Sequence, residues 1–184
     1  MTISGTETPM RVTMPADLPS EAGRIAVLVP CYNEEVAVGH VVKAFRTALP
    51  QATVYVFDNN STDRTVTVAL EAGAEVRHVT TQGKGNVVRR MFADIDADIY
   101  LLVDGDDTYD AASAPAMVEA LLKDHLDMVV GCRTSAEQAA YRLGHRFGNA
   151  LLTNMVAMIF GRTFTDILSG YRAFSRRYVK SFPA

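Results

Sequence analysis

Five short apolar runs alternate along the chain with longer segments in which apolar residues recur at helical spacing. Apolar runs of about four to eight residues bounded by turn residues are typical of buried strands. The segment after the first run carries Val38, Val41, Val42 and Phe45, a spacing that predicts one apolar helix face. The predicted strands are residues 24–30, 52–58, 74–80, 98–104 and 126–133.

Helix boundaries can be predicted from the residues that flank these patterns. Asn33 is a residue type that caps helices, and Glu34 and Glu35 would favour a first helical turn, so we expect a helix to begin there. The helix after the second strand should stop near Gly73, because glycine is common just past a helix end.

Strands that alternate with helices predict an α/β fold with a doubly wound, mostly parallel sheet. Right-handed crossovers bring the carboxyl ends of such strands to one edge, where these sheets bind ligands. Polar clusters follow the predicted strands in turn, and the sequence therefore predicts a site at that edge. The clusters are PCYNEE (30–35), DNNSTD (58–63), QGKG (82–85), DGDD (104–107) and GCR (131–133).

Composition narrows the class of protein. The 184 residues, 48% hydrophobic and 21% charged, suit one globular domain, which we place at residues 24–184 after a flexible polar arm at residues 1–23. The net charge of −3 argues against nucleic acid as a partner. Oligomeric state has no signature in the sequence.

Three further features concern the compartment. The two cysteines, Cys31 and Cys132, form no CxxC pair, which suits a reducing compartment. The first residues lack the apolar core of a signal peptide, so we expect a cytoplasmic protein that can lie against the inner face of the membrane. The apolar segment 150–160 predicts either a core helix or a helix lying on lipid.

Two common nucleotide sites are not supported. QGKGN (82–86) lacks the GxxxxGK[ST] spacing of a P-loop, and no GxGxxG fingerprint follows the first strand. Neither an ATPase of that type nor an ordinary dinucleotide dehydrogenase is indicated. Asp58, at the end of the second strand, could accept hydrogen bonds from a nucleobase or ribose, or could simply form a turn.

The densest acidic stretch suggests a metal. Asp104 and Asp106, separated by Gly105, could both reach one hard divalent cation, and a diphosphate could complete its oxygen shell. Asp107 has no clear role, and Asp110 reads as a helix cap or a surface charge.

With these motifs in this order, the chain from Arg24 onward resembles the catalytic domain of glycosyltransferase family 2, of the GT-A type. It is most similar to the branch that includes dolichol-phosphate mannose synthase, which glycosylates polyprenyl phosphates. The resemblance rests on VLVPCYNEE (27–35), VFDNNSTDRT (56–65), GKGN (83–86), LLVDGDDTYD (101–110), VVGCR (129–133) and FTDILSGYRAFSRR (164–177).

The resemblance implies a donor and metal site for a nucleotide-diphospho-sugar. Asp106 would be the main ligand of Mg²⁺ or Mn²⁺, and Asp104 would assist it and lie near the sugar or ribose. The other donor residues would be Pro30, Tyr32, Glu34 and Asp58 around the nucleoside, with Lys84 and Arg133 near the phosphates.

The acceptor is less determined. Arg142 and Arg146 precede the apolar segment 150–160, an order that suits a phosphate head on a lipid tail or, alternatively, a solvated amphipathic helix. Together with Arg133 and Ser169 they are the candidate contacts of an acceptor phosphate. Asp166 either contacts the acceptor side, as in the polyprenyl-phosphate branch, or acts as base for a hydroxyl acceptor. With Asp104, Asp106 and Arg133, Asp166 completes the candidate catalytic set.

Three functions stay open. The first is an inverting, metal-dependent glycosyltransferase with a polyprenyl-phosphate acceptor, the second uses a hydroxyl acceptor, and the third is a nucleotide-sugar-binding module without catalysis. Members of the family usually continue beyond the point that matches Ala184. We therefore expect either a catalytic domain truncated at its C-terminus or an unusually short protein.

Overall fold

A computed structural model describes residues 23–131 and 169–182, which form a sheet with helices on both faces. The sheet has six strands in the order β3-β2-β1-β4-β6-β5. β1 pairs in parallel with β2 and β4, and β2 with β3, whereas β6 runs antiparallel between β4 and β5. The strands are β1 (Ile25–Cys31), β2 (Thr53–Asp58), β3 (Glu75–His78), β4 (Ile99–Leu102), β5 (Met128–Val130) and β6 (Arg172–Ser175).

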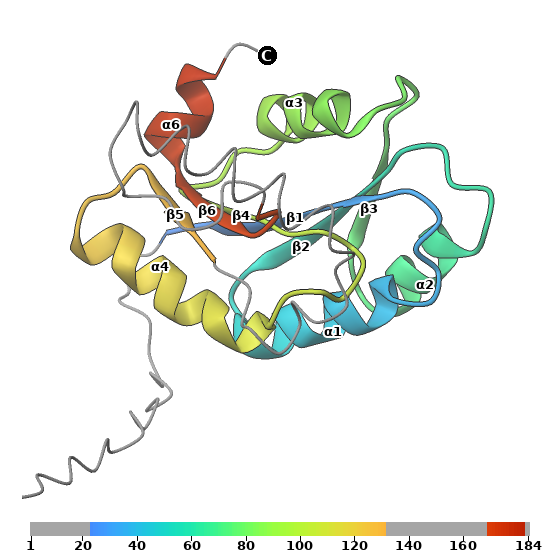
Figure 1. The fold of residues 1–184 in the computed structure, drawn as a ribbon, viewed down its shortest axis with the longest axis horizontal. Helices are drawn as coiled ribbons and strands as arrows, with labels where there is room; N and C mark the ends of the chain where they lie inside the picture. Colours follow the sequence, from blue (N-terminus) through green and yellow to red (C-terminus); the bar gives the residue numbers. More distant parts are fainter. Residues whose placement is uncertain (1–22, 132–168, 183–184) are drawn as a thin grey trace, which may run out of the picture.

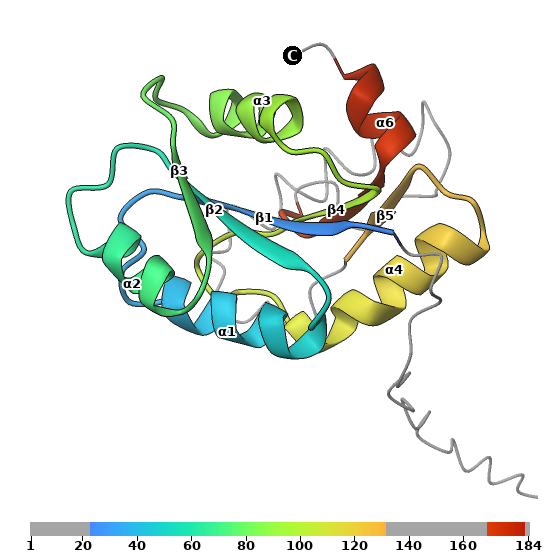
Figure 2. The same ribbon diagram turned by 180° about the vertical axis from the view of Figure 1, so that it is seen from behind.

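The helices form one layer on each face of the sheet, as Figures 1 and 2 show from opposite sides. α1 (Val38–Ala48), α2 (Thr65–Glu71) and α4 (Ala114–Lys123) cover one face. α3 (Lys84–Asp94) and α6 (Arg176–Ser181) cover the other. A short 3-10 helix, η2 (Ala111–Ser113), leads into α4. None of the helices in these ranges is long and apolar enough to cross a membrane.

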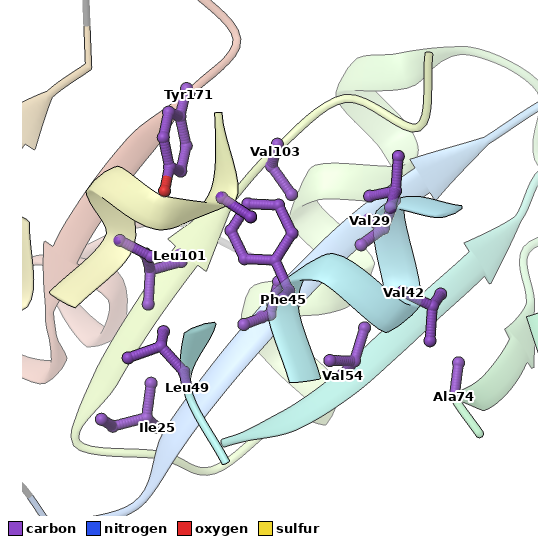
Figure 3. Packing of buried hydrophobic residues seen from close by; sticks show 14 of the residues in the cluster. Ile25, Val29, Val42, Phe45, Leu49, Val54, Ala74, Leu101, Val103 and Tyr171 are labelled. Atoms are coloured by element: carbon purple, nitrogen blue, oxygen red, sulfur yellow. The ribbon is translucent and has the colours of Figure 1, made fainter. Parts of the chain in front are cut away.

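The side chains of β1 are divided between two cores because successive residues of a strand point to opposite faces. Ile25, Val27 and Val29 pack with α1 and α4, whereas Ala26 and Leu28 pack with α3 and α6. In the first core Phe45 of α1 lies among Val29, Leu101 and Tyr171 (Figure 3). Burial on both faces explains why this central strand reads as a continuous apolar run.

The first four predicted strands and the helices between them are confirmed, as is the mostly parallel α/β class. No sequence pattern predicted β6, which lies between β4 and β5. Its two outer residues, Arg172 and Ser175, are polar and half-buried, so the buried pair Ala173 and Phe174 between them is too short to be recognised as an apolar run. The place of β6 in the sheet depends on pairing with strands far away in the sequence.

The parallel register brings the carboxyl ends of three strands together. Cys31 pairs with Asp58, and Asp58 pairs with His78 on β3. On the other side of β1, Leu28 pairs with Leu102, and the Val103 N–H donates to the carbonyl of Leu28. The loops after β1, β2, β3 and β4 therefore begin at the same edge of the sheet.

Candidate active site

A pocket of about 250 Å³ opens at the carboxyl edge of the parallel strands. Loops from four places in the sequence form its wall, which is the convergence predicted from the polar clusters. The lining residues are Pro30, Cys31, Tyr32, Glu34, Asn59, Lys84, Val87, Asp104, Gly105 and Asp106. Asp58, expected at the nucleoside, lies beside this wall and is not part of it.

The loop after β1 is fastened to the loop after β2 by side chains that accept backbone N–H groups. Asn33 has a positive φ of 56°, and its side chain accepts from the N–H of Thr62 at 2.8 Å. The N–H of Glu34 donates to Thr65 Oγ1 at 2.8 Å. The predicted helix start at Asn33 is therefore wrong, because this amide is committed to the neighbouring loop and α1 begins at Val38.

Asn59 organises the next loop and was not recognised from the sequence. Its side-chain nitrogen donates to the carbonyls of Val79 and Thr81 at 2.8 and 3.0 Å, and its oxygen accepts from the Gly83 N–H at 2.8 Å. The side chain thereby fixes the turn at Gly83, which has φ 121° and precedes α3. The signal available in the sequence was an asparagine directly after a buried strand.

Asp58 is 3% exposed and has partners within the chain. Its Oδ1 accepts from the Ser61 N–H at 3.2 Å, and its Oδ2 lies 3.2 Å from His78 Nδ1. These contacts match the turn role considered from the sequence. A contact between Asp58 and a nucleoside stays a prediction.

Lys84 and Asp104 form the main ion pair of the pocket. Lys84 Nζ lies 2.5 Å from Asp104 Oδ1, with the two side chains 58% and 24% exposed. Lys84 is the first residue of α3, so the turn at Gly83 places the Lys84 ammonium near the end of β4. The cation that the acidic cluster requires is thus supplied, in part, by the protein itself.

Gly105 is required by close approach of the backbone. A Cβ at this position would lie 2.7 Å from the Sγ of Cys31. Burial, together with the charges of nearby carboxylates such as Glu34 and Asp58, raises the pKa of Cys31. The thiol therefore stays protonated at neutral pH and packs as a small apolar group.

The remaining carboxylates lie on the loop after β4, residues 104–110 (the acidic loop), and have different surroundings. Asp106 is exposed and accepts from the Thr108 N–H at 3.2 Å. Asp107 has φ 61° and its Oδ2 lies 2.7 Å from His40 Nδ1 on α1. Asp110 accepts from the Ala112 N–H at 2.9 Å and caps η2, as expected of it.

Glu34 experiences the negative charge of this loop. Partial burial, followed by repulsion from Asp106, Asp104 and Asp63, raises the pKa of Glu34. Like charges disfavour the ionised form of a carboxyl group. A cation bound among these carboxylates would relieve the same repulsion.

The donor set fits a hard divalent cation that brings further oxygen ligands. Asp104 and Asp106 offer carboxylate oxygens, the ligands that Mg²⁺ and Mn²⁺ favour. Within residues 23–131 and 169–182, no three His, Cys, Asp or Glu side chains gather into a metal site. Two carboxylates from the chain would hold the cation only together with water and the phosphates of a ligand.

Ser169, a candidate contact of the acceptor phosphate, is not among the residues that line the pocket. Its hydroxyl donates to the carbonyl of Gly131 at 2.6 Å, and the residue is 2% exposed. This contact joins the end of β5 to the start of β6, and a contact with an acceptor phosphate stays a prediction. The other acceptor-side candidates lie outside the described residues: Arg133, Arg142, Arg146, Asp166 and the apolar segment 150–160.

Comparisons with known proteins give a consistent picture. The model of the family "Glycosyl transferase family 2" matches residues 26–182. The chain is 63% identical over 123 residues to protein RfbJ of Shigella flexneri, an alignment that covers 66% of this chain and 95% of RfbJ. It is 31% identical over 153 residues to the dolichyl-phosphate hexose transferase of Haloferax volcanii, covering 83% of this chain and 66% of that protein.

Solved structures share the fold. Glucosyl-3-phosphoglycerate synthase of Mycobacterium tuberculosis, in complex with Mn²⁺, UDP and glucosyl-3-phosphoglycerate, matches with a TM-score of 0.69 and 25% identity. A complex of the same synthase with Mn²⁺, UDP-glucose and phosphoglyceric acid matches with a TM-score of 0.70 and 24% identity. Each match covers 84% of this chain but 57% of the synthase, so the chain spans little more than half of that protein.

Proposed function

The chain belongs to glycosyl transferase family 2, and we propose that it transfers a sugar from a nucleotide-diphospho-sugar to a polyprenyl phosphate with inversion at the anomeric carbon. The observation that carries the donor half of this proposal is the meeting of Lys84, Asp104 and Asp106 at one pocket. Carboxylates for a cation and an ammonium for phosphate are the groups that a diphosphate leaving group requires.

The chain's own residues have distinct tasks in this proposal. Asp106 and Asp104 would hold Mg²⁺ or Mn²⁺, which, when bound, offsets the negative charge that grows on the leaving diphosphate. Lys84 would turn from Asp104 toward the phosphates, a short movement for a flexible side chain that is 58% exposed. Pro30 and Tyr32 line the same pocket and would contact the nucleoside.

Support for the cation comes from the related synthase, whose complexes contain Mn²⁺ with UDP or UDP-glucose. The donor set of two carboxylates accepts either Mg²⁺ or Mn²⁺, because both are hard cations that prefer oxygen.

A lipid phosphate acceptor is supported by the name of one relative, the dolichyl-phosphate hexose transferase. A phosphate is already ionised near neutral pH and needs no general base, whereas a hydroxyl does. Cations are then needed to place it against an anionic donor, and Arg133, Arg142 and Arg146 are the residues we propose for this task. Asp166 would contact the same acceptor side.

The charge distribution of the described residues also favours a membrane surface. α3 and α6 carry six Lys and Arg residues and one acidic residue, whereas the other described residues carry seven Lys and Arg and fifteen Asp and Glu. Arg90, Arg176 and Arg177 form ion pairs, yet their side chains remain 61%, 45% and 75% exposed. A basic layer of this kind would attract anionic lipid headgroups.

A hydroxyl acceptor is the second candidate. The solved synthase is described with phosphoglyceric acid and glucosyl-3-phosphoglycerate, neither of which is a lipid. In that case a base is required, and Asp166 is the residue we would assign to it.

One set of assays separates these possibilities. We expect UDP- or GDP-sugar binding to require Mn²⁺ or Mg²⁺ and to be lost in Asp106→Asn, while the control Asp124→Asn, an exposed acid at the end of α4, binds as wild type. Transfer is then measured with polyprenyl phosphate and with free sugars as acceptors. Metal-independent binding in Asp106→Asn would refute the metal assignment, and transfer to free sugars alone would refute the lipid acceptor. Binding without transfer to any acceptor would favour a non-catalytic module.

A further inference from the structure

Tyr109 connects the acidic loop to the chain that enters β6. Its hydroxyl accepts a hydrogen bond from the Gly170 N–H at 2.6 Å. Its ring lies 5.5 Å from the ring of Tyr171, centroid to centroid, and the side chain is half-buried. The two partners are 61 positions apart in the sequence, so this contact joins two separate walls of the site.

Gly170 packs directly against the carboxylate of Asp104. A Cβ at Gly170 would overlap Asp104 Oδ2, so any side chain at this position would push the carboxylate aside. The other oxygen of the same carboxylate, Oδ1, is held by Lys84. Asp104 is thus confined on both sides, by an ammonium at one oxygen and by the backbone of Gly170 at the other.

The neighbours of Gly170 are anchored independently of Tyr109. Ser169 Oγ donates to the carbonyl of Gly131, and the Gly131 N–H donates to the carbonyl of Tyr171 at 2.9 Å. These bonds tie the strand ends together but do not reach the acidic loop. The hydrogen bond from the Gly170 N–H to Tyr109 is the contact that holds Gly170 against the acidic loop.

We propose that Tyr109 is a positioning residue, which holds Gly170 against Asp104 and thereby keeps this carboxylate turned toward Lys84 and the pocket. This inference rests on the proposed function, because it treats Asp104 as a ligand of the divalent cation. A carboxylate held in place before the cation arrives loses less conformational freedom on binding it. Tyr109 is not among the described residues that line the pocket, so we assign it no direct contact with the cation or the donor.

The test is removal of one oxygen atom. Tyr109→Phe keeps the ring and its packing on Tyr171 but cannot accept from Gly170. We expect the affinity for Mn²⁺ in the presence of UDP, measured by electron paramagnetic resonance, to fall about threefold to tenfold. This range corresponds to the free energy of one hydrogen bond. Gly170→Ala, which pushes on Asp104 directly, should weaken binding at least as much. Tyr178→Phe is the matched control, because its ring stacks on Phe174 at 5.2 Å on the other face of the sheet.

A double-mutant cycle separates positioning from a general loss of structure. In an Asp104→Asn background, the further change Tyr109→Phe should leave the remaining Mn²⁺ affinity unchanged, because its effect passes through Asp104. An equal loss in both backgrounds, or no loss in the wild-type background, would overturn the proposal. The proposal would also be overturned if Tyr109→Phe lowered the melting temperature so far that unfolded protein accounted for the whole loss of Mn²⁺ affinity.

A ligand-free measurement distinguishes failure of this inference from failure of the proposed function. In wild type the Gly170 amide should exchange slowly with deuterium, and the ¹³C resonance of the Asp104 carboxylate should shift in Tyr109→Phe but not in Tyr178→Phe. If the protein bound no Mn²⁺ yet these signals behaved as expected, the metal site would be refuted and the contact would stand as a positioning device for Asp104. Unchanged exchange and an unchanged resonance would refute the positioning role itself.

Discussion

Lys84 Nζ lies 2.5 Å from Asp104 Oδ1, so the first residue of α3 neutralises a carboxylate at the tip of β4. The pair occupies the place where a divalent cation and a diphosphate are proposed to bind. Under the proposed function Lys84 would have two competing partners, Asp104 in the free protein and the phosphates in the complex. This relationship gives opposite expectations for the cation and for the nucleotide.

Replacing Lys84 should separate those two effects. In Lys84→Gln we expect Mn²⁺ alone to bind more tightly, because Asp104 loses its competing cation, whereas UDP in the presence of Mn²⁺ should bind about tenfold more weakly, because a charge-assisted contact is lost. Calorimetric titrations measure both affinities. Lys43→Gln, an exposed residue of α1, serves as the control. Weaker binding of both ligands would contradict the competition.

Glu34 predicts a pH dependence of stability. Its pKa is raised by partial burial and by Asp106, Asp104 and Asp63, so its ionised form is disfavoured in the folded protein. A raised pKa means that the folded state binds the proton more tightly, and this contribution to stability is lost as pH rises through the folded pKa.

We therefore expect Glu34→Gln to melt at a higher temperature than wild type at pH 7. The difference should shrink as pH falls through the folded pKa toward the ordinary value for glutamate, about 4.3. Glu119→Gln, on the exposed face of α4, should show no such trend. A constant difference across the pH range would mean that Glu34 acts through packing rather than charge.

Asn59 should contribute to the stability of the folded protein. Asn59→Ala removes three hydrogen bonds at a residue that is 6% exposed, so we expect the free energy of unfolding to fall by about 2–3 kcal/mol. Urea denaturation measures this loss. Asn86→Ala, which removes one exposed bond to the carbonyl of Gln82, should cost less than about 1 kcal/mol. An equal loss of unfolding free energy in both variants would show that the buried hydrogen bonds of Asn59 stabilise the protein no more than an exposed one.

The basic residues of α3 and α6 predict binding to an anionic membrane surface. In Arg89→Glu/Arg90→Glu, we expect sedimentation with vesicles of phosphatidylglycerol and phosphatidylcholine to fall more than tenfold, since each basic residue near such a surface contributes about 1 kcal/mol. Lys43→Glu/Lys123→Glu reverses two exposed charges on the opposite layer and should sediment like wild type. Equal losses in both variants would show that total charge, rather than the α3 and α6 face, governs binding.

Local pattern was enough for much of the fold. The apolar runs at β1, β2 and β4 and the helical spacing of Val38, Val41, Val42 and Phe45 predicted elements that are present. The order of polar clusters predicted the edge at which the pocket lies. Each of these inferences depends on neighbouring residues, whose side-chain directions follow from the period of a strand or a helix.

The errors and omissions arose where partners are distant in the sequence. Asn33 has the chemistry of a helix cap, but the nearby loop after β2 offers its side chain the N–H of Thr62 instead. β6 was missed because its four residues gain their place only by pairing with β4 and β5. Asn59 was passed over because its three partners lie on the loop that follows β3.

The sequence by itself determined the α/β class, the family resemblance and the types of side chain at the site. Only the tertiary structure decided how each carboxylate is paired: Asp104 lies beside Lys84, and Asp107 lies beside His40. It also decided that Tyr109 bonds to the backbone of Gly170, which packs against Asp104. The physical reason is the range of the interactions. Periodicity and capping act within a few residues, whereas an ion pair or a backbone contact across a site exists only after the sheet has brought its strand ends together.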